Sequence, residues 1–221
     1  MSHPLLQAKE LFKSYGRRKV LRGVSFEIAP CTLVGIVGEN GAGKSTLLRI
    51  LAGDVRLSRG TVLRSGAMGY CPQQVILNDA LTVSQHLDYF RAAYRITSLR
   101  RADELVEQLG YHAYRRELVG TLSGGTKQKL NLTLALIHQP DVLLLDEPYQ
   151  GFDWETYLRF WELVTVLRER GCAVLVISHL FFERQRFDAL YRLQAGQVHA
   201  QDQPDVAGDA LGMPPTGKKE R

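Results

Sequence analysis

A glycine-rich turn between an apolar run and a helical pattern constrains this chain more than any other feature. Residues 31–38, CTLVGIVG, are almost continuously apolar, as expected of a strand buried on both faces of a parallel sheet. Residues 44–53, KSTLLRILAG, have helical spacing and end in a glycine that can close the helix. The connecting residues 38–45, GENGAGKS, fit G-x-x-x-x-G-K-[ST] at every fixed position. The sequence therefore predicts an α/β fold with a phosphate-binding loop.

The residue types of this loop suit a nucleoside triphosphate. Glycines let backbone N–H groups curl around phosphate oxygens, and the following helix N-terminus adds positive potential. Lys44 can reach the β- and γ-phosphates, and the Ser45 hydroxyl can bind Mg²⁺. An ordinary glycine-rich turn is the alternative, and a dinucleotide fold is disfavoured because Thr46 replaces the last glycine of G-x-G-x-x-G. We expect the nucleotide to contact Gly38, Glu39, Asn40, Gly41, Ala42, Gly43, Lys44, Ser45 and Thr46.

Two carboxylates end a second buried strand, which the apolar run 142–147, VLLLDE, predicts. A charge at that place is costly without a partner. Asp146 suits a residue that binds Mg²⁺ beside the phosphate loop, either directly or through a coordinated water. Glu147 can orient and deprotonate a water in line with the γ-phosphate. The alternative is a strand end that simply emerges into solvent, but a phosphate loop on a neighbouring strand favours the catalytic interpretation.

Shorter patterns predict elements around this centre. The run 172–178, CAVLVIS, indicates a third buried strand. Residues 5–30 contain short apolar segments that indicate antiparallel strands, and residues 61–71 indicate another strand pair. Residues 82–118 have a helical and largely polar pattern.

The C-terminal half adds a long helix and a polar end. Residues 154–170 predict an amphipathic helix closed by Gly171. Its expected apolar face comprises Trp154, Tyr157, Leu158, Trp161, Val164 and Leu167. Pro, Gly and charged residues dominate residues 201–221, so we expect a flexible tail there and a single domain over residues 1–200.

Charge and cysteine content limit the partners of the chain. The net charge of +5 over 221 residues is mild and scattered, which is typical of solvated faces, and no nucleic acid is expected. The three cysteines are far apart, which argues against a disulfide framework or a zinc site. The N-terminus does not resemble a signal peptide, and no apolar run reaches the ~18 residues that cross a bilayer. Any membrane partner is therefore expected to be a separate chain.

The order of the motifs resembles the nucleotide-binding subunits of ABC transporters over roughly residues 5–200. Tyr15, just before GRRKVL, matches the aromatic residue that stacks on adenine, although it could also be a plain strand-end tyrosine. Gln73 in YCPQQ matches the glutamine that reaches Mg²⁺ and the attacking water, with Gln74 as the alternative register. Leu122-Ser123-Gly124-Gly125 matches the signature that sets this family apart from other phosphate-loop proteins.

Two further residues match motifs that follow the acidic pair. Asp153 matches the aspartate of the family's D-loop, and it can also cap the helix that begins next to it. His179, after the third buried strand, matches the histidine that bonds the γ-phosphate; a satisfied structural histidine is the alternative. The resemblance therefore implies catalytic roles for Gln73, Glu147 and His179, and metal-binding roles for Ser45, Gln73 and Asp146.

The resemblance implies a P-loop NTPase fold: a mostly parallel sheet flanked by helices, an N-terminal antiparallel β-subdomain and a small helical subdomain at about residues 75–125. It implies an ATPase that uses ATP and Mg²⁺ and pairs head to tail with a second cassette, so that Ser123, Gly124 and Gly125 face the partner's ATP. A separate permease would dock on the helical subdomain, and the chain would lie at the cytoplasmic side of the cell membrane.

Two departures from the family pattern bear on function. Thr126 stands where the signature usually continues with Gln, and Trp154 takes a common Pro position after YQGFD. The segment SGGTKQKL and the short length resemble cassettes that serve export permeases more than those that import sugars. Two other functions compete with transport: a soluble ABC ATPase in DNA repair or translation, and a nucleotide-dependent binding module without turnover. Lys44, Asp146, Glu147 and His179 together argue against the second of these.

Overall fold

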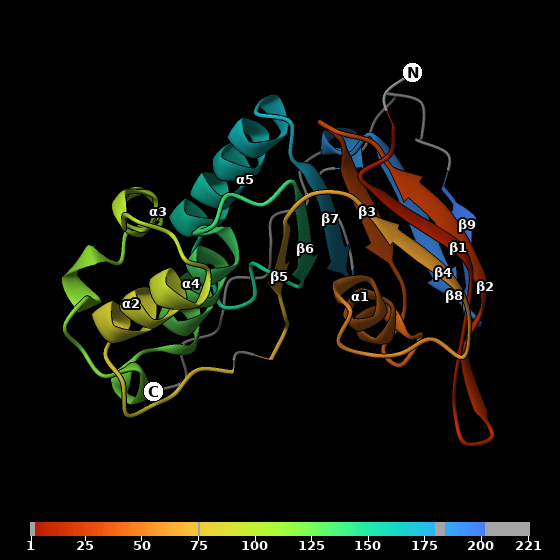
Figure 1. The fold of residues 1–221 in the computed structure, drawn as a ribbon, viewed down its shortest axis with the longest axis horizontal. Helices are drawn as coiled ribbons and strands as arrows, with labels where there is room; N and C mark the ends of the chain where they lie inside the picture. Colours follow the sequence, from red (N-terminus) through yellow and green to blue (C-terminus); the bar gives the residue numbers. More distant parts are fainter. Residues whose placement is uncertain (1–2, 75, 180–183, 202–221) are drawn as a thin grey trace.

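Two sheets and a group of helices make up the computed structural model, which describes residues 3–74, 76–179 and 184–201 (Figure 1). Within these residues the larger sheet has six strands, of which all but one edge strand run parallel. In spatial order they are β5 (Met68–Cys71), β6 (Val142–Asp146), β7 (Ala173–Ser178), β3 (Leu33–Val37), β8 (Ala189–Gln194) and the antiparallel edge strand β9 (Gln197–Ala200). The expected buried strands are therefore the three central neighbours β6, β7 and β3.

The smaller sheet is antiparallel and lies beside the β3–β8–β9 end of the larger one (Figure 1). Its order is β2 (Arg18–Ile28), β1 (Leu6–Tyr15) and β4 (Arg59–Arg64). The antiparallel strands expected in residues 5–30 are confirmed. The strand pair expected in residues 61–71 is wrong, because β4 joins β1 in this sheet while β5 pairs with β6 in the other. A short link between two strands does not make a hairpin when each strand finds a better partner elsewhere.

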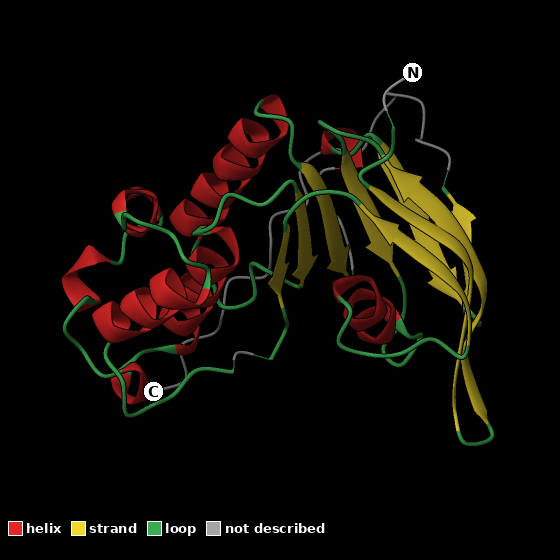
Figure 2. Ribbon diagram, in the orientation of Figure 1, coloured by secondary structure: helices red, strands yellow, loops and turns green. Residues whose placement is uncertain are grey.

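Most of the helices gather on the opposite flank of the larger sheet, whereas α1 (Lys44–Ala52) lies on the face turned toward the antiparallel sheet (Figure 2). The helices are α1 (Lys44–Ala52), α2 (Val83–Ala93), α3 (Arg100–Gln108), α4 (Gly124–Leu136) and α5 (Trp154–Glu169), with short 3₁₀ turns η1 (His112–Tyr114), η2 (Val119–Thr121) and η3 (Arg184–Arg186). The helix expected at 44–53 is confirmed, and Gly53 closes it with a left-handed φ of 95°. In the part of the chain that the structure describes, we find no helix of the length and apolarity that crossing a bilayer requires.

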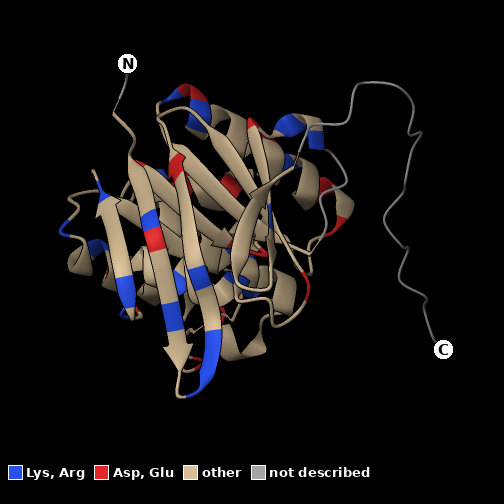
Figure 3. Ribbon diagram, turned by 90° about the vertical axis from the view of Figure 1, so that its right-hand side faces the viewer, with Lys and Arg blue, Asp and Glu red and all other residues tan. Residues whose placement is uncertain are grey.

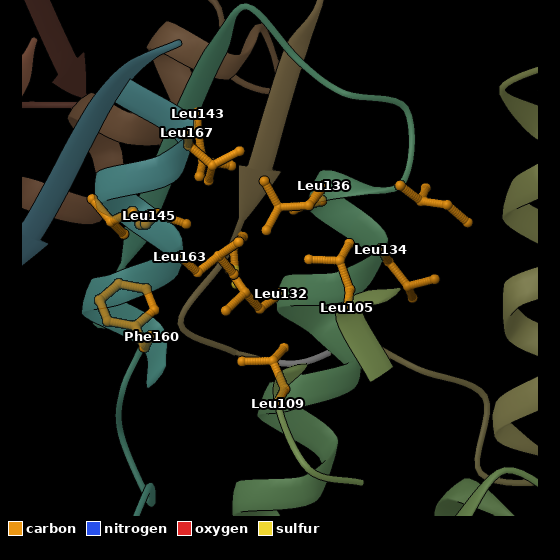
Figure 4. Close-up of a cluster of buried hydrophobic side chains, with 14 of the residues drawn as sticks. Leu105, Leu109, Leu132, Leu134, Leu136, Leu143, Leu145, Phe160, Leu163 and Leu167 are labelled. Atoms are coloured by element: carbon orange, nitrogen blue, oxygen red, sulfur yellow. The ribbon is translucent and has the colours of Figure 1, made fainter. Parts of the chain in front are cut away.

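Both faces of the central strands are buried, which explains their continuous apolar runs. On one face, Leu143 and Leu145 of β6 meet α4 and α5, with Phe160, Leu163 and Leu167 pointing toward them (Figure 4). On the other face, alternate residues of the same strands pack against α1 and the antiparallel sheet. The functional side chains at the ends of these strands are thus held by a core on each side.

The buried face of α5 matches the expected one in part, because Trp161, Val164 and Leu167 are buried as expected but the N-terminal residues are not. Trp154 is 56% exposed and Leu158 is 37% exposed, whereas Phe160 and Leu163 are fully or almost fully buried. The helix has apolar residues around much of its circumference, so its own periodicity does not define one face. Trp154 instead stacks on Tyr157, with ring centroids 5.5 Å apart, at the start of the helix.

Charged side chains are spread over the surface, with Lys and Arg frequent on the antiparallel strands (Figure 3). There, the acidic residues Glu10 and Glu27 are interspersed among the more numerous basic ones. Of the expected tail 201–221, only Gln201 is among the described residues, and its backbone N–H donates to the carbonyl of Leu190. Gln201 therefore continues the sheet edge.

Candidate functional site

The glycine-rich loop leaves the end of β3 and enters α1 with little room for side chains. A Cβ on Gly38 would lie 2.5 Å from the Leu193 carbonyl oxygen, and Gly43 has a left-handed φ of 106° and packs on Val20. The Lys44 Nζ atom donates to the carbonyls of Gly38, at 2.6 Å, and Glu39, at 3.1 Å. The lysine thus bridges the loop from inside, and burial lowers its pKa.

A cleft of about 420 Å³ opens beside this loop. Its lining combines the loop with residues from the ends of other strands: Tyr15, Arg18, Val20, Asn40, Gly41, Gly43, Lys44, Ser45, Thr46, Gln73, Glu147 and His179. The structure therefore brings the expected adenine-stacking residue, the loop and the three expected catalytic residues to one cavity. Gly38, Glu39 and Ala42 instead line a second, neighbouring cleft of about 300 Å³, which shares Asn40 and Gly41 with the first.

Tyr15 is positioned to offer one ring face to a ligand. The residue is 47% exposed, and the Lys13 ammonium lies 4.6 Å from the centre of its ring. The sequence prediction missed Arg18 and Val20, which follow Tyr15 at the start of β2 and also line the cleft. Their closeness to Tyr15 in the chain is the signal that could have found them.

Asp146 ends β6 in a buried position, 2% exposed, next to the start of α1. Burial raises the pKa of its carboxyl group, while a hydrogen bond from the Ser45 hydroxyl and the charge of Lys44 act in the opposite direction. A buried carboxylate with a hydroxyl beside it provides oxygen ligands of the kind that Mg²⁺ prefers. The donor set therefore fits the magnesium site expected from the sequence.

Glu147 is the centre of a hydrogen-bonded group at the mouth of the cleft. One carboxylate oxygen accepts from Gln73 Nε2 at 3.0 Å, and the other lies 2.5 Å from His179 Nε2. The backbone of Glu147 has a φ of 49°, unusual for a non-glycine residue, and its N–H donates to the Ile177 carbonyl. Gln73 and His179, from two other strand ends, thus both contact the Glu147 carboxylate. Gln73 rather than Gln74 is the glutamine that reaches it.

The signature motif forms the start of α4 and is not part of the lining of this cleft. Ser123 is the N-cap, and its hydroxyl accepts from the Thr126 N–H at 3.2 Å. A Cβ on Gly124 would meet nothing within 4 Å, whereas a Cβ on Gly125 would lie 2.4 Å from the Gly151 carbonyl oxygen. The glycine at 125 is therefore required by the chain's own loop, which is a contact that the signature motif alone does not show.

Asp153 caps α5, because its carboxylate accepts from the Thr156 N–H at 2.7 Å. Hydrogen bonds from the side chain and then the backbone N–H of Thr156 lower the pKa of Asp153. The capping role weighed from the sequence is confirmed.

A family model described as ABC transporter matches residues 21–150, which is more than half of the chain. The chain belongs to the ABC transporter family. The matched segment contains the glycine-rich loop, the signature and the acidic pair.

Curated relatives of this cassette have different cargoes in their names. It is 39% identical over 184 residues to the zinc import ATP-binding protein ZnuC of Alcanivorax borkumensis, covering 81% of this chain and 70% of the relative. It is 31% identical over 194 residues to the linearmycin resistance ATP-binding protein LnrL of Bacillus subtilis, covering 81% of this chain. The chain spans only 62% of the length of LnrL.

Solved structures agree with the fold. An ATP-binding subunit of an ABC transporter matches with a TM-score of 0.83 and 26% identity, over 88% of both chains. A dimeric bacterial ABC transporter cassette matches with a TM-score of 0.79 and 24% identity, over 87% of this chain and 96% of the other. The expected fold class, a mostly parallel sheet with an antiparallel sheet and flanking helices, is confirmed.

Thr126, the unusual signature residue, supports Ser123. It is buried, and its hydroxyl oxygen lies 2.9 Å from that of Ser123. When Thr126 donates, the backbone N–H and hydroxyl of Thr126 occupy both lone pairs of Ser123 Oγ, which leaves the Ser123 hydrogen free for an incoming acceptor.

We therefore expect Thr126→Val to lower the ATPase kcat about three- to tenfold, the worth of one hydrogen bond, and Thr126→Ser to stay within twofold of the wild type. Phosphate release at saturating ATP measures both. Equal rates for the Val variant and the wild type would show that the hydroxyl has no such role. An active Thr126→Gln variant beside an inactive wild type would show instead that Thr126 prevents hydrolysis.

Proposed function

We propose that this cassette hydrolyses ATP as a head-to-tail dimer and thereby powers transport through a separate permease. The observation that supports this most is the convergence of Gln73, Glu147 and His179 at the open side of a phosphate-loop cleft. A carboxylate placed between an amide and an imidazole is suited to orient a water molecule and accept its proton.

The chain's residues divide the work of binding ATP and Mg²⁺. Tyr15 stacks on the base, the loop 38–46 and Lys44 hold the phosphates, and Ser45 and Asp146 supply ligands for Mg²⁺. Gln73 donates its amide nitrogen to Glu147, so its amide oxygen is the atom that it offers to the metal. Bound Mg²⁺ would neutralise charge on the phosphate oxygens.

Glu147 and His179 act on the reacting end of the nucleotide. Glu147 accepts the proton of the attacking water, and His179, as neighbour of that carboxylate, donates to the γ-phosphate. Asp153 contributes from the D-loop, where it already caps α5.

The dimer is proposed because the signature lies away from the chain's own cleft. Ser123, Gly124 and Gly125 lie outside the lining of the chain's own cleft, and space is open above Gly124. The exposed N-terminus of α4 offers free N–H groups and the positive end of the helix dipole, which favours a phosphate of a second copy. One structural neighbour is a dimeric cassette.

The two glycines of the signature give a matched test of this dimer. In Gly124→Ala the new methyl group meets only open space in the single chain, so we expect an unchanged or slightly higher thermal midpoint and at least tenfold lower kcat. In Gly125→Ala the methyl group would collide with Gly151, so we expect a lower thermal midpoint as well.

Calorimetry and phosphate release would measure both variants at several protein concentrations. In a head-to-tail dimer the specific activity of the wild type rises with concentration, since each active site needs two chains. Full activity of Gly124→Ala, or activity independent of concentration, would contradict the dimer.

The proposed division of the chain is an ABC ATPase domain at residues 1–200, with a helical subdomain at about 75–125. Within that subdomain, Ile76, Tyr89, Tyr114 and Leu118 expose much of their apolar surface, which suits a docking seat for a helix of the permease. We place the chain at the cytoplasmic side of the membrane, held there by this contact.

Export is the proposed direction, because the signature segment reads SGGTKQKL. The relatives include both a zinc import protein and a resistance protein, so they leave the cargo open. The reading frames next to this chain are the first place to search for a multi-span protein. Co-expression with such a protein, followed by co-purification and transport into inside-out vesicles, tests partner and direction together. Failure to co-purify any multi-span protein would contradict the transport role.

A further inference from the structure

Two buried amide side chains on α4 connect the signature helix to the catalytic residues of the same chain. Gln128 is 3% exposed and Asn131 is 8% exposed, and they lie three residues apart on one face of the helix. Both face the ends of β5 and β6 rather than solvent. The phosphate-binding scheme described above uses neither residue.

Their hydrogen bonds reach the backbone next to the catalytic pair. Asn131 Nδ2 donates to the Pro72 carbonyl at 3.0 Å, in the peptide group that leads directly to Gln73. Gln128 Nε2 donates to the Pro148 carbonyl at 3.2 Å, in the residue that directly follows Glu147. The two amides therefore hold the two segments that carry the catalytic glutamine and glutamate.

A buried thiol completes the group. Cys71 is fully buried at the end of β5, and its Sγ atom lies 3.3 Å from Asn131 Nδ2 and 3.8 Å from Gln128 Nε2. Buried amides stay in a core only when their donors are satisfied, so this arrangement has a defined geometry. We call Cys71, Gln128 and Asn131 the amide clamp.

The clamp matters because α4 and Glu147 serve different nucleotides in the proposed dimer. The N-terminus of α4 contacts the partner's ATP, whereas Gln73 and Glu147 act on the chain's own ATP. A rigid helix that is hydrogen-bonded to both catalytic segments transmits a shift at its N-terminus to them. The left-handed backbone of Glu147 needs such support from its surroundings.

We propose that Gln128 and Asn131 are positioning residues that couple binding of the partner's ATP at the signature to the placement of Gln73 and Glu147. This inference rests on the proposed dimeric ATPase. It assigns a function to two side chains within α4 that hold the catalytic segments without touching the nucleotide.

The test compares Asn131→Leu and Gln128→Met with Thr133→Val in the full chain. The first two variants keep side-chain volume and remove the donors to Pro72 and Pro148. Thr133 is a matched control on the same helix: it is fully buried and accepts from the Tyr111 hydroxyl at 2.7 Å, away from the catalytic segments. Thermal midpoint, ATP affinity, KM and kcat are measured, with rates normalised to the fraction that binds nucleotide.

We expect similar losses of thermal midpoint in all three variants. We expect kcat to fall about tenfold or more in Asn131→Leu and Gln128→Met, with ATP affinity and KM within twofold, because small displacements of catalytic groups are costly. Thr133→Val keeps its kcat within twofold. A kcat for both clamp variants that equals that of Thr133→Val would overturn the proposal. A rise in KM as large as the fall in kcat would overturn it too.

A double variant separates coupling from local positioning. Gly124→Ala acts at the signature, so combining it with Asn131→Leu gives a less than multiplicative loss of kcat if the clamp carries the signal. Fully multiplicative losses would show that the signal takes another route. If the specific activity of the wild type does not depend on protein concentration, the proposed dimer is wrong. If that activity does depend on concentration but the clamp variants keep the wild-type kcat, only the proposed role of the clamp is wrong.

Discussion

Glu147→Gln abolishes turnover and traps an ATP-bound dimer; this is the largest effect that the site predicts. The replacement is isosteric, so one oxygen still accepts from Gln73 and the pocket keeps its shape. The amide cannot accept a proton from water, and loss of a general base costs ~10²–10⁴-fold in rate. ATP binding persists because Lys44 and the loop are untouched, so the closed state accumulates.

Phosphate release and size-exclusion chromatography with ATP would measure the two parts of this result. Glu162→Gln is the matched control, because Glu162 is exposed on α5 and lies outside the cleft lining. It should hydrolyse ATP at the wild-type rate and show no additional dimer. Normal turnover in Glu147→Gln would mean that another group activates the water.

Lys44→Ala should remove most of the affinity for ATP. The ammonium group is buried in the loop and bridges two of its carbonyls, so its loss removes a charge and also frees the loop. Hydrogen bonds to charged groups contribute about 1.5–3 kcal/mol each, so two lost contacts to phosphates predict at least ~100-fold weaker binding. Hydrolysis at fixed ATP falls accordingly.

Titration with a fluorescent ATP analogue would measure this loss directly. Lys9→Ala serves as the control, since Lys9 is exposed on β1 and does not line the cleft. It removes the same charge from the chain and should leave the affinity unchanged. Equal affinities for both variants would contradict the assignment of the phosphate loop.

Local sequence patterns were sufficient for the centre of the site. GENGAGKS, the acidic pair and the buried strands that carry them are contiguous, and their chemistry follows from residue type and order. The placement of Gln73 and His179 beside Glu147 followed from the family resemblance. No spacing rule predicts that three strand ends meet, because that depends on strand order in the sheet.

The sequence predictions were wrong where a segment could pack or pair with more than one other segment. Residues 61–71 contain two strands, but pairing with β1 on one side and β6 on the other divides them between sheets. The first turn of α5 carries Trp154 on a helix with apolar residues on several sides, and the position of the sheet selects Phe160 and Leu163 for burial. Both outcomes depend on competition among distant surfaces.

The sequence by itself determined that this chain binds a nucleotide and belongs to the ABC family, because phosphate loops and signatures are short segments whose residues act next to one another. Only the tertiary structure decided that Gly125 is required by Gly151, and that Gln128 and Asn131 hold the segments of Glu147 and Gln73. Those contacts join residues 20 to 60 positions apart, and they exist only once the helix has packed on the sheet.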